Sequence, residues 1–274
     1  MAAIEPVDIV ELGIGDAQAG LVLSTEAGWN QNEADWRFFL SKGVVFGMRD
    51  GARLVASAAL LPYSAGNAWI SMVLVTADFR RRGIATKLMN ACLDVAKRRE
   101  LTTWLDATPA GAAVYGPLGF MPTLQLRRLR LEKPQHTKAA QPLSAGSLEA
   151  LATRDSRAMG FDRSTLLSEF AARPGSCIVS DDRAMALLRN GRTARQIGPL
   201  LADRADQALA LVNAIVGCET GAFLIDAVHY QEEFLNGLVQ SGWNIERPFQ
   251  RMRFGRPTAP PAQLPFAVAG PEFG

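Results

Sequence analysis

A basic loop joins an apolar run to a helical pattern in the stretch Met72-Val73-Leu74-Val75-Thr76-Ala77-Asp78-Phe79-Arg80-Arg81-Arg82-Gly83-Ile84-Ala85-Thr86-Lys87-Leu88. Residues 68–75 are almost all apolar, which is typical of a strand covered on both faces. From Gly83 onward, apolar residues such as Ile84, Leu88 and Val95 recur at helical spacing. This order predicts a central strand, a tight loop, and a helix that packs one face on the sheet.

The loop has the composition of an anion site. Backbone N–H groups at a helix N-terminus favour phosphate oxygens, and a small residue such as Gly83 or Ala85 lets a ligand approach the backbone. We expect a diphosphate to be bound by the run Arg80, Arg81, Arg82, Gly83, Ile84, Ala85 and Thr86. The competing interpretation is a surface turn with solvated arginines, because short arginine and glycine patterns arise often.

The elements around this loop predict a mixed α/β fold. A helical region reaches to about residue 40, and strands at 44–48 and 53–61 flank the turn Asp50-Gly51. After the helix come a short strand at 103–105, a short helix at 110–115 and a strand at 124–131.

The second half of the chain repeats this order. Leu105-Asp106-Ala107 is echoed by Ile225-Asp226-Ala227, and Gly119-Phe120 with Arg128 to Leu131 is echoed by Gly242-Trp243 with Arg251 to Phe254, at equal spacing. Such order favours a duplication. We therefore predict domains at 1–132 and 148–255, a linker at 133–147, and a proline-rich tail at 256–274 whose docking the sequence leaves open.

Composition excludes several classes of protein. The 274 residues carry a net charge of only +2, which argues against a nucleic-acid partner. Three scattered cysteines give neither a disulfide framework nor a metal site. No segment has the pattern of a secretory signal or a membrane span, so we expect a cytoplasmic protein with no membrane partner.

The central loop resembles the signature of the GNAT N-acetyltransferases: Gln or Arg, two residues, Gly, one residue, then Gly or Ala, after the central strand. Tyr115, Gly119 and Phe120 match a second motif of that family. The resemblance implies two GNAT-like domains, each a mostly antiparallel sheet with a central, splayed parallel pair flanked by helices. It also implies acetyl-CoA as co-substrate, bound by the first domain. The second copy has Ala202-Asp203-Arg204-Ala205-Asp206 in place of the glycine loop and is predicted to be degenerate.

The resemblance further implies direct attack of a primary amine, from a small molecule or a peptide, on the thioester within a ternary complex. A backbone N–H near Leu74 or Val75 would polarise the carbonyl, and Tyr115 would protonate the departing thiolate. The base is Glu26, Asp106 or a water relay.

Structural readings compete with each of these roles. Tyr115 could simply pack its helix, and Asp106 could cap the next helix, as its echo Asp226 suggests. The aromatic residues Trp29, Trp36, Phe38 and Phe39 are more often core than pocket, and neither His136 nor His229 is placed for catalysis.

The sequence is also compatible with two other functions. One is a non-catalytic acyl-CoA-binding sensor or interaction module. The other is an enzyme that uses a longer acyl donor or an aminoacyl-tRNA, although the near-neutral charge argues against tRNA. The second domain is expected to form one wall of the acceptor site, since small-molecule sites favour domain junctions. The acceptor and the oligomeric state are not determined by the sequence.

Overall fold

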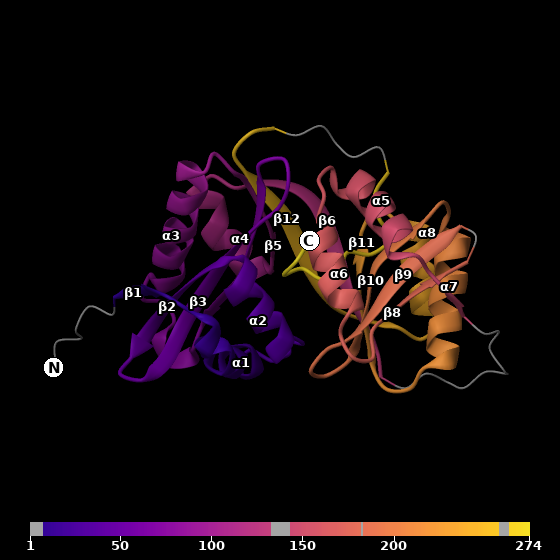
Figure 1. The fold of residues 1–274 in the computed structure, drawn as a ribbon, viewed down its shortest axis with the longest axis horizontal. Helices are drawn as coiled ribbons and strands as arrows, with labels where there is room; N and C mark the ends of the chain where they lie inside the picture. Colours follow the sequence, from indigo (N-terminus) through magenta and orange to yellow (C-terminus); the bar gives the residue numbers. More distant parts are fainter. Residues whose placement is uncertain (1–7, 133–142, 182, 258–262) are drawn as a thin grey trace.

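The chain forms one continuous twelve-stranded sheet with helices on both faces (Figure 1). A computed structural model describes residues 8–132, 143–181, 183–257 and 263–274. We call 8–132 the N-terminal half, 143–257 the C-terminal half and 263–274 the C-terminal segment. The N-terminal half contains β1 (Ile9–Glu11), η1 (Ile14–Asp16), α1 (Ala17–Glu26), α2 (Glu33–Lys42), β2 (Val44–Asp50), β3 (Arg53–Pro62), β4 (Asn67–Val75), η2 (Ala77–Phe79), α3 (Ile84–Arg98), β5 (Thr102–Ala107), α4 (Pro109–Tyr115), η3 (Gly116–Leu118) and β6 (Met121–Leu131).

The C-terminal half repeats this order of elements. It contains β7 (Ser144–Ala145), α5 (Leu148–Met159), α6 (Ser164–Ala171), β8 (Cys177–Ser180), β9 (Ala184–Asn190), β10 (Arg195–Ala202), α7 (Ala205–Cys218), β11 (Phe223–Val228), α8 (Glu232–Gln240) and β12 (Asn244–Phe254).

The two halves exchange their last strands. The strand order is β1-β2-β3-β4-β5-β12-β6-β11-β10-β9-β8-β7, so β12 lies beside β5 and β6 lies beside β11. The strands β6 and β12 pair with each other, antiparallel, at the centre. Each half therefore completes its sheet with a strand from the other half, and the two predicted sheets are joined edge to edge.

The sheet has two short parallel pairs, one in each half. The strands β4 and β5 pair only over three residues each, from Asn67 with Thr102 to Trp69 with Trp104. The strands β10 and β11 likewise pair only from Arg195 with Phe223 to Ile197 with Ile225. All other pairs are antiparallel. Beyond these pairs the parallel strands diverge, which confirms the predicted mixed fold with a splayed pair in each half.

A bulge in β4 marks the start of the open part. The pairing with β3 shifts between Ser71 and Leu74. Met72 there has a positive φ of 53°, and its carbonyl accepts a hydrogen bond of 2.7 Å from Ser57 Oγ. A bulge leaves peptide groups outside the ladder and bends the strand, so it re-aims the backbone at the splay.

Helices cover the sheet because side chains alternate between its two faces. Leu61 and Trp69 point to one face, where they pack with residues of α1, α2, α5 and α6 from both halves. Leu60 and Ile70 point to the other face, under α3 and α4. In the C-terminal half this other face is covered by α7 and α8.

The C-terminal segment docks on the sheet. Phe273 is fully buried, with its ring stacked on Phe39 at 4.8 Å and edge-on to Phe170 at 4.9 Å. Pro271 O accepts a 2.9 Å hydrogen bond from Trp69 Nε1. The docking that the sequence left open is thus settled for residues 263–274.

Most predicted elements lie within a few residues of the observed ones, but two short strands were missed. β1 precedes the helices predicted at the start of the chain, and β7 lies inside the stretch interpreted as a linker. Residues 1–7, most of that linker including His136, and 258–262 of the tail lie outside the described residues. In the described part of the chain, no helix is both long and apolar enough to cross a bilayer.

Candidate active site

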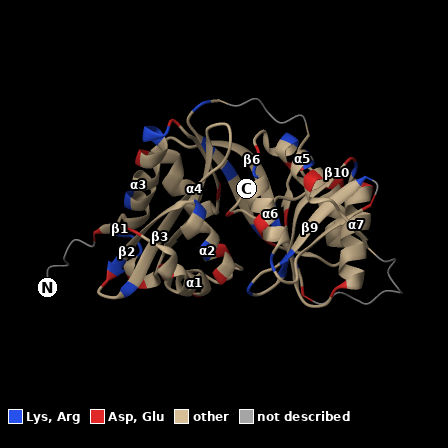
Figure 2. Cartoon of the chain, in the orientation of Figure 1, with Lys and Arg blue, Asp and Glu red and all other residues tan. Residues whose placement is uncertain are grey.

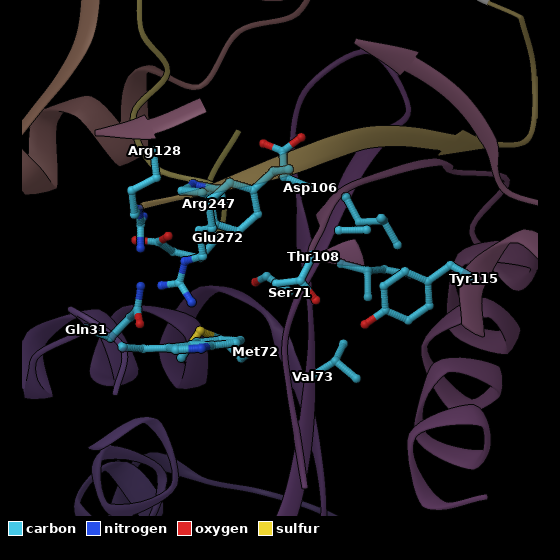
Figure 3. A pocket seen from close by; sticks show the side chains of 16 residues that line it. Gln31, Ser71, Met72, Val73, Asp106, Thr108, Tyr115, Arg128, Arg247 and Glu272 are labelled. Carbon is cyan, nitrogen blue, oxygen red and sulfur yellow. The ribbon is translucent and has the colours of Figure 1, made fainter. Parts of the chain in front are cut away.

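A cavity lies at the splay of β4 and β5, beside the bulge (Figure 3). Its volume is about 80 Å³. The walls come from the end of β4 (Ser71 to Val73), from the end of β5 with the start of α4, and from the loop after α1. The remaining wall comes from β6, β12 and the C-terminal segment, so residues far apart in the sequence build one site.

The loop before α3 has the geometry of an anion site. Gly83 is the N-cap residue of α3 with φ 73°, and Arg81 also has a positive φ of 61°. The first hydrogen bond of the helix joins Lys87 N to Gly83 O. The amides of residues 83–86 therefore precede the intrahelical ladder, and the left-handed residues curve the backbone as in anion-binding nests.

The three arginines of this loop differ in their contacts. Arg80 Nε donates to Val75 O at 3.1 Å, and Arg82 donates to Asp78 O at 2.6 Å with its guanidinium over the Phe79 ring. Arg81 is exposed. Arg80 and Arg82 thus fold back on the loop, while Gly83 is exposed and has nothing within 4 Å of the position that a Cβ would occupy.

In the register of β4, Leu74 and Val75 direct their peptide groups to opposite edges of the strand. Thr76 N donates to Val55 O at 2.9 Å, and Leu74 is opposite Ser57. Alternate residues of an antiparallel strand direct their peptide groups to opposite edges. Leu74 therefore faces β3, and Val75 faces the edge from which β5 has diverged.

Tyr115 lines the cavity from the end of α4, on the side of Val73 (Figure 3). The centroid of its ring lies 6.2 Å from that of Phe120, the last residue of the second motif. Burial raises the pKa of Tyr115 above its usual range. The phenol therefore keeps its proton at neutral pH, as a proton donor requires.

Asp106 is held in a buried ion pair. Both of its carboxylate oxygens accept hydrogen bonds of 2.8 Å from Arg251 of β12, the residue directly opposite in the register. Asp226 makes the same pair with Arg128 of β6, at 2.8 and 2.9 Å. The cap of α4 is instead Thr108, so the shared role is to join the exchanged strands, and the structure does not support Asp106 as the base.

Glu26 is also engaged outside the cavity. Its Oε1 accepts a 3.0 Å hydrogen bond from Ala77 N, at the start of the loop, and its other oxygen lies 3.8 Å from Arg53. Glu26 does not line the cavity among the described residues. Its contacts therefore position the start of the loop.

Of the four aromatic residues considered for the acceptor pocket, three belong to the core and one lines the cavity. Trp36, Phe38 and Phe39 are buried in the core, whereas Trp29 is half-buried and lines the cavity. His229 lies after β11 in the C-terminal half and is not part of the cavity wall.

Several polar residues of the cavity were not foreseen from the sequence: Gln31, Ser71, Arg128, Arg247 and Glu272. Burial raises the pKa of Glu272, against the opposing effect of Arg189, which donates to it at 3.1 Å. The sequence signal was the unusual basicity of two strands, because β6 and β12 each carry three arginines. Figure 2 shows the basic residues on these central strands.

The corresponding splay in the C-terminal half is filled by the chain itself. Ala267 forms β-bridges to both Leu200 of β10 and Ala227 of β11. A Cβ at Gly198 would lie 2.0 Å from Val268 O, so the segment presses directly on β10.

The start of α7 is also unsuited to an anion. Asp206 lies in its first turn and pairs with Arg204 at 2.7 Å, and the hydrogen bond from Arg204 lowers the pKa of Asp206. An ionised carboxylate at this position repels a second anion.

Comparison with known proteins agrees with this two-part architecture. Residues 20–120 match the profile of the acetyltransferase (GNAT) family, and residues 151–265 match that of an acetyltransferase (GNAT) domain. The chain is similar to the uncharacterized N-acetyltransferase YitH of Bacillus subtilis, at 23% identity, with 82% of this chain and 83% of YitH covered.

Solved structures share the fold at low identity. A putative acetyltransferase from Pyrococcus horikoshii superposes with a TM-score of 0.83 at 17% identity, covering 99% of this chain and 97% of that one. A tandem GNAT protein from the clavulanic acid biosynthesis pathway gives 0.66 at 15% identity, covering 93% and 100%. With a GNAT match in each half, an open splay in one and a filled splay in the other, the chain belongs to the GNAT family of acetyltransferases and is built from two GNAT domains.

Proposed function

We propose that the N-terminal half binds acetyl-CoA and transfers its acetyl group to a primary amine by direct attack in a ternary complex. The observation that carries this proposal is the contrast between the halves. Of the two described halves, only the N-terminal one combines an open splay with a helix start suited to an anion. The first amides of α3 precede the intrahelical hydrogen bonds, and its first turn contains no acidic residue.

The residues present fit such a co-substrate. The amides of residues 83–86 and Arg81 receive the diphosphate. Val75 offers its N–H to the amide-containing arm of the co-substrate in the splay, while its carbonyl accepts from Arg80 Nε. The bulge at Met72 and Val73 bends β4 at the splay, where a free backbone N–H would polarise the thioester carbonyl. Acetyl-CoA supplies the activated acyl group.

The reaction requires two proton transfers in the cavity, one to the departing thiolate and one from the attacking amine. Tyr115 protonates the departing thiolate, because its phenol is protonated and lines the cavity beside Val73. The cavity carboxylates, Asp106 and Glu272, are both bound by arginines. We therefore assign the proton of the attacking amine to water in the cavity.

Two measurements on the full-length chain test this function. Isothermal titration should show acetyl-CoA binding with one site per chain, since the second splay is filled. Release of free CoA thiol in the presence of a panel of amines should then show turnover. Absence of acetyl-CoA binding refutes the proposal, and binding without turnover on any amine identifies a sensor instead. The full chain is required, because β5 pairs with β12.

A further inference from the structure

The acceptor side of the cavity holds buried polar atoms without partners. Gln31 Oε1, Ser71 Oγ and Arg247 Nε all lack a hydrogen bond to the described residues, and all three residues line the cavity. Gln31 is only 3% exposed and Ser71 only 8%. Buried polar groups are normally hydrogen-bonded, so this concentration indicates a polar ligand.

Arg247 is the charged member of the group, and no carboxylate of the described residues pairs with it within 4.0 Å. Burial lowers the pKa of Arg247 and the positive charge of Arg128 lowers it further, and these two effects outweigh the opposing charges of the nearby carboxylates Asp226, Glu246 and Glu272. Both effects are unfavourable to the folded protein unless an anion compensates them.

The sheet register places a second positive charge beside Arg247. Arg247 of β12 lies directly opposite Arg128 of β6, and like charges at such positions destabilise a sheet. Arg128 is neutralised by both oxygens of Asp226, and Glu272 is bound by Arg189. Arg247 is therefore the arginine of this wall that forms no ion pair with a carboxylate of the described residues.

The arrangement in the cavity gives the orientation of a ligand. Figure 3 shows Arg247, Arg128 and Gln31 on one side of Ser71, and Tyr115 on the other. An acceptor that reaches the bulge with its amine would thus direct its other end toward Arg247.

The repeated half provides an internal comparison. Arg247 follows Gly242 by five residues, and Leu124 follows Gly119 by five, so the two are equivalent in the duplication. Leu124 is 8% exposed and belongs to the same hydrophobic cluster as Val268 of the C-terminal segment. This duplicated position is therefore apolar (Leu124) at the splay that the C-terminal segment fills, and cationic (Arg247) at the splay that is open.

We propose that the acceptor is a small amine that also carries a carboxylate, which the guanidinium of Arg247 binds while Gln31 and Ser71 hydrogen-bond the same molecule. This proposal rests on the proposed function. A guanidinium pairs with a carboxylate through two parallel hydrogen bonds. The cavity volume of about 80 Å³ corresponds to roughly five to eight water molecules, which suits a compound of amino-acid size.

The reaction is balanced without any further reactant. The amine nitrogen forms a bond to the acetyl carbon as the carbon–sulfur bond breaks. The nitrogen loses one proton and the thiolate gains one, and the carboxylate is unchanged.

The test compares matched acceptors with the full-length protein. Amino acids, their carboxamides and the corresponding amines without the carboxyl group are assayed by thiol release at fixed acetyl-CoA. We expect kcat/KM to be higher for the carboxylated member of a pair, on the order of 10- to 100-fold, as for a hydrogen-bonded ion pair. Because this comparison uses the native protein, it stands even where a variant fails to fold.

Variants then assign the effect to Arg247. Arg247→Leu, which copies the equivalent Leu124, should abolish the preference for the carboxylated member. The control Arg127→Leu removes a half-buried arginine of the adjacent strand that is outside the cavity wall, and it should keep the preference. Acetyl-CoA binding is measured on every variant.

The outcomes separate this proposal from the function on which it rests. Loss of acetyl-CoA binding in the native protein refutes the function. Turnover of neutral amines equal to that of carboxylated ones, or a preference unchanged in Arg247→Leu, overturns the carboxylate site alone. Native protein that binds acetyl-CoA but neither binds nor acetylates any carboxylated amine of the panel also overturns it.

Discussion

Asp106 on β5 and Arg251 on β12 form a two-point ion pair between strands that belong to different halves of the sequence. The side chains are 0% and 8% exposed, and both hydrogen bonds measure 2.8 Å. Asp226 and Arg128 repeat the pair on the other side of the centre. The duplication has thus preserved one ionic contact for each exchanged strand.

Removing one partner of this pair should destabilise the protein. Asp106→Asn leaves Arg251 buried without a counter-charge, and we expect the free energy of unfolding to fall by about 3–5 kcal/mol. Asp226→Asn should cost a similar amount, whereas Asp206→Asn, at an exposed ion pair, should leave the denaturation midpoint unchanged. If Asp106→Asn instead kept full stability and lost turnover, Asp106 would be a catalytic group.

A negative charge at the head of α3 should abolish co-substrate binding. Gly83→Glu places a carboxylate where the diphosphate is proposed to bind, and it forces a side chain into the left-handed region. We expect acetyl-CoA affinity to fall by at least about 10-fold in isothermal titration, since the lost contacts are charge-assisted. Ala85→Trp should act in the same direction by steric exclusion.

The matched control lies at the N-cap of α7. Arg204→Glu introduces the same side chain at the equivalent helix start of the other half. Acetyl-CoA affinity should be unchanged there, and an equal loss in both variants would argue for a general electrostatic effect.

Tyr115→Phe should separate turnover from binding. The variant keeps the ring that packs on Phe120 and lacks the hydroxyl, so we expect kcat to fall by roughly 10²-fold or more with little change in acetyl-CoA affinity. Equal kcat in the two proteins would show that the ring only packs α4.

The raised pKa of Tyr115 also predicts a pH dependence. A tyrosine in the unfolded chain ionises near pH 10, whereas burial keeps the folded group protonated to higher pH. Its contribution to stability is complete below about pH 10 and is lost as the pH rises further. Thermal unfolding from pH 8 to 11 should show a smaller decline for Tyr115→Phe.

Gly198→Ala should displace the C-terminal segment. The added Cβ would meet Val268 O at 2.0 Å, and neither backbone can yield without losing the bridges of Ala267. We expect a loss of about 1–3 kcal/mol, as for other overpacked sites, with faster proteolysis of residues 263–274. Gly15→Ala has nothing within 4 Å of the new Cβ, so it should behave as the native protein.

The sequence by itself determined the features that depend on near neighbours in the chain. The periodicity of residues 68–98 identified β4, the loop and α3, and the spacing of Tyr115, Gly119 and Phe120 identified the second motif. The echo of Asp106 in Asp226 revealed the duplication. Such patterns record which face of an element is buried and where its backbone turns.

Only the tertiary structure decided which strands are neighbours and which residues meet in the cavity. The alternation in β6 and β12 is the same whichever partner lies beside them, so the sequence could not show the exchange. For the same reason it could not show that Arg247 and Glu272 line a cavity that Tyr115 enters from another element. Residues far apart in the chain acquire a shared role only when long-range pairing places their side chains around one volume.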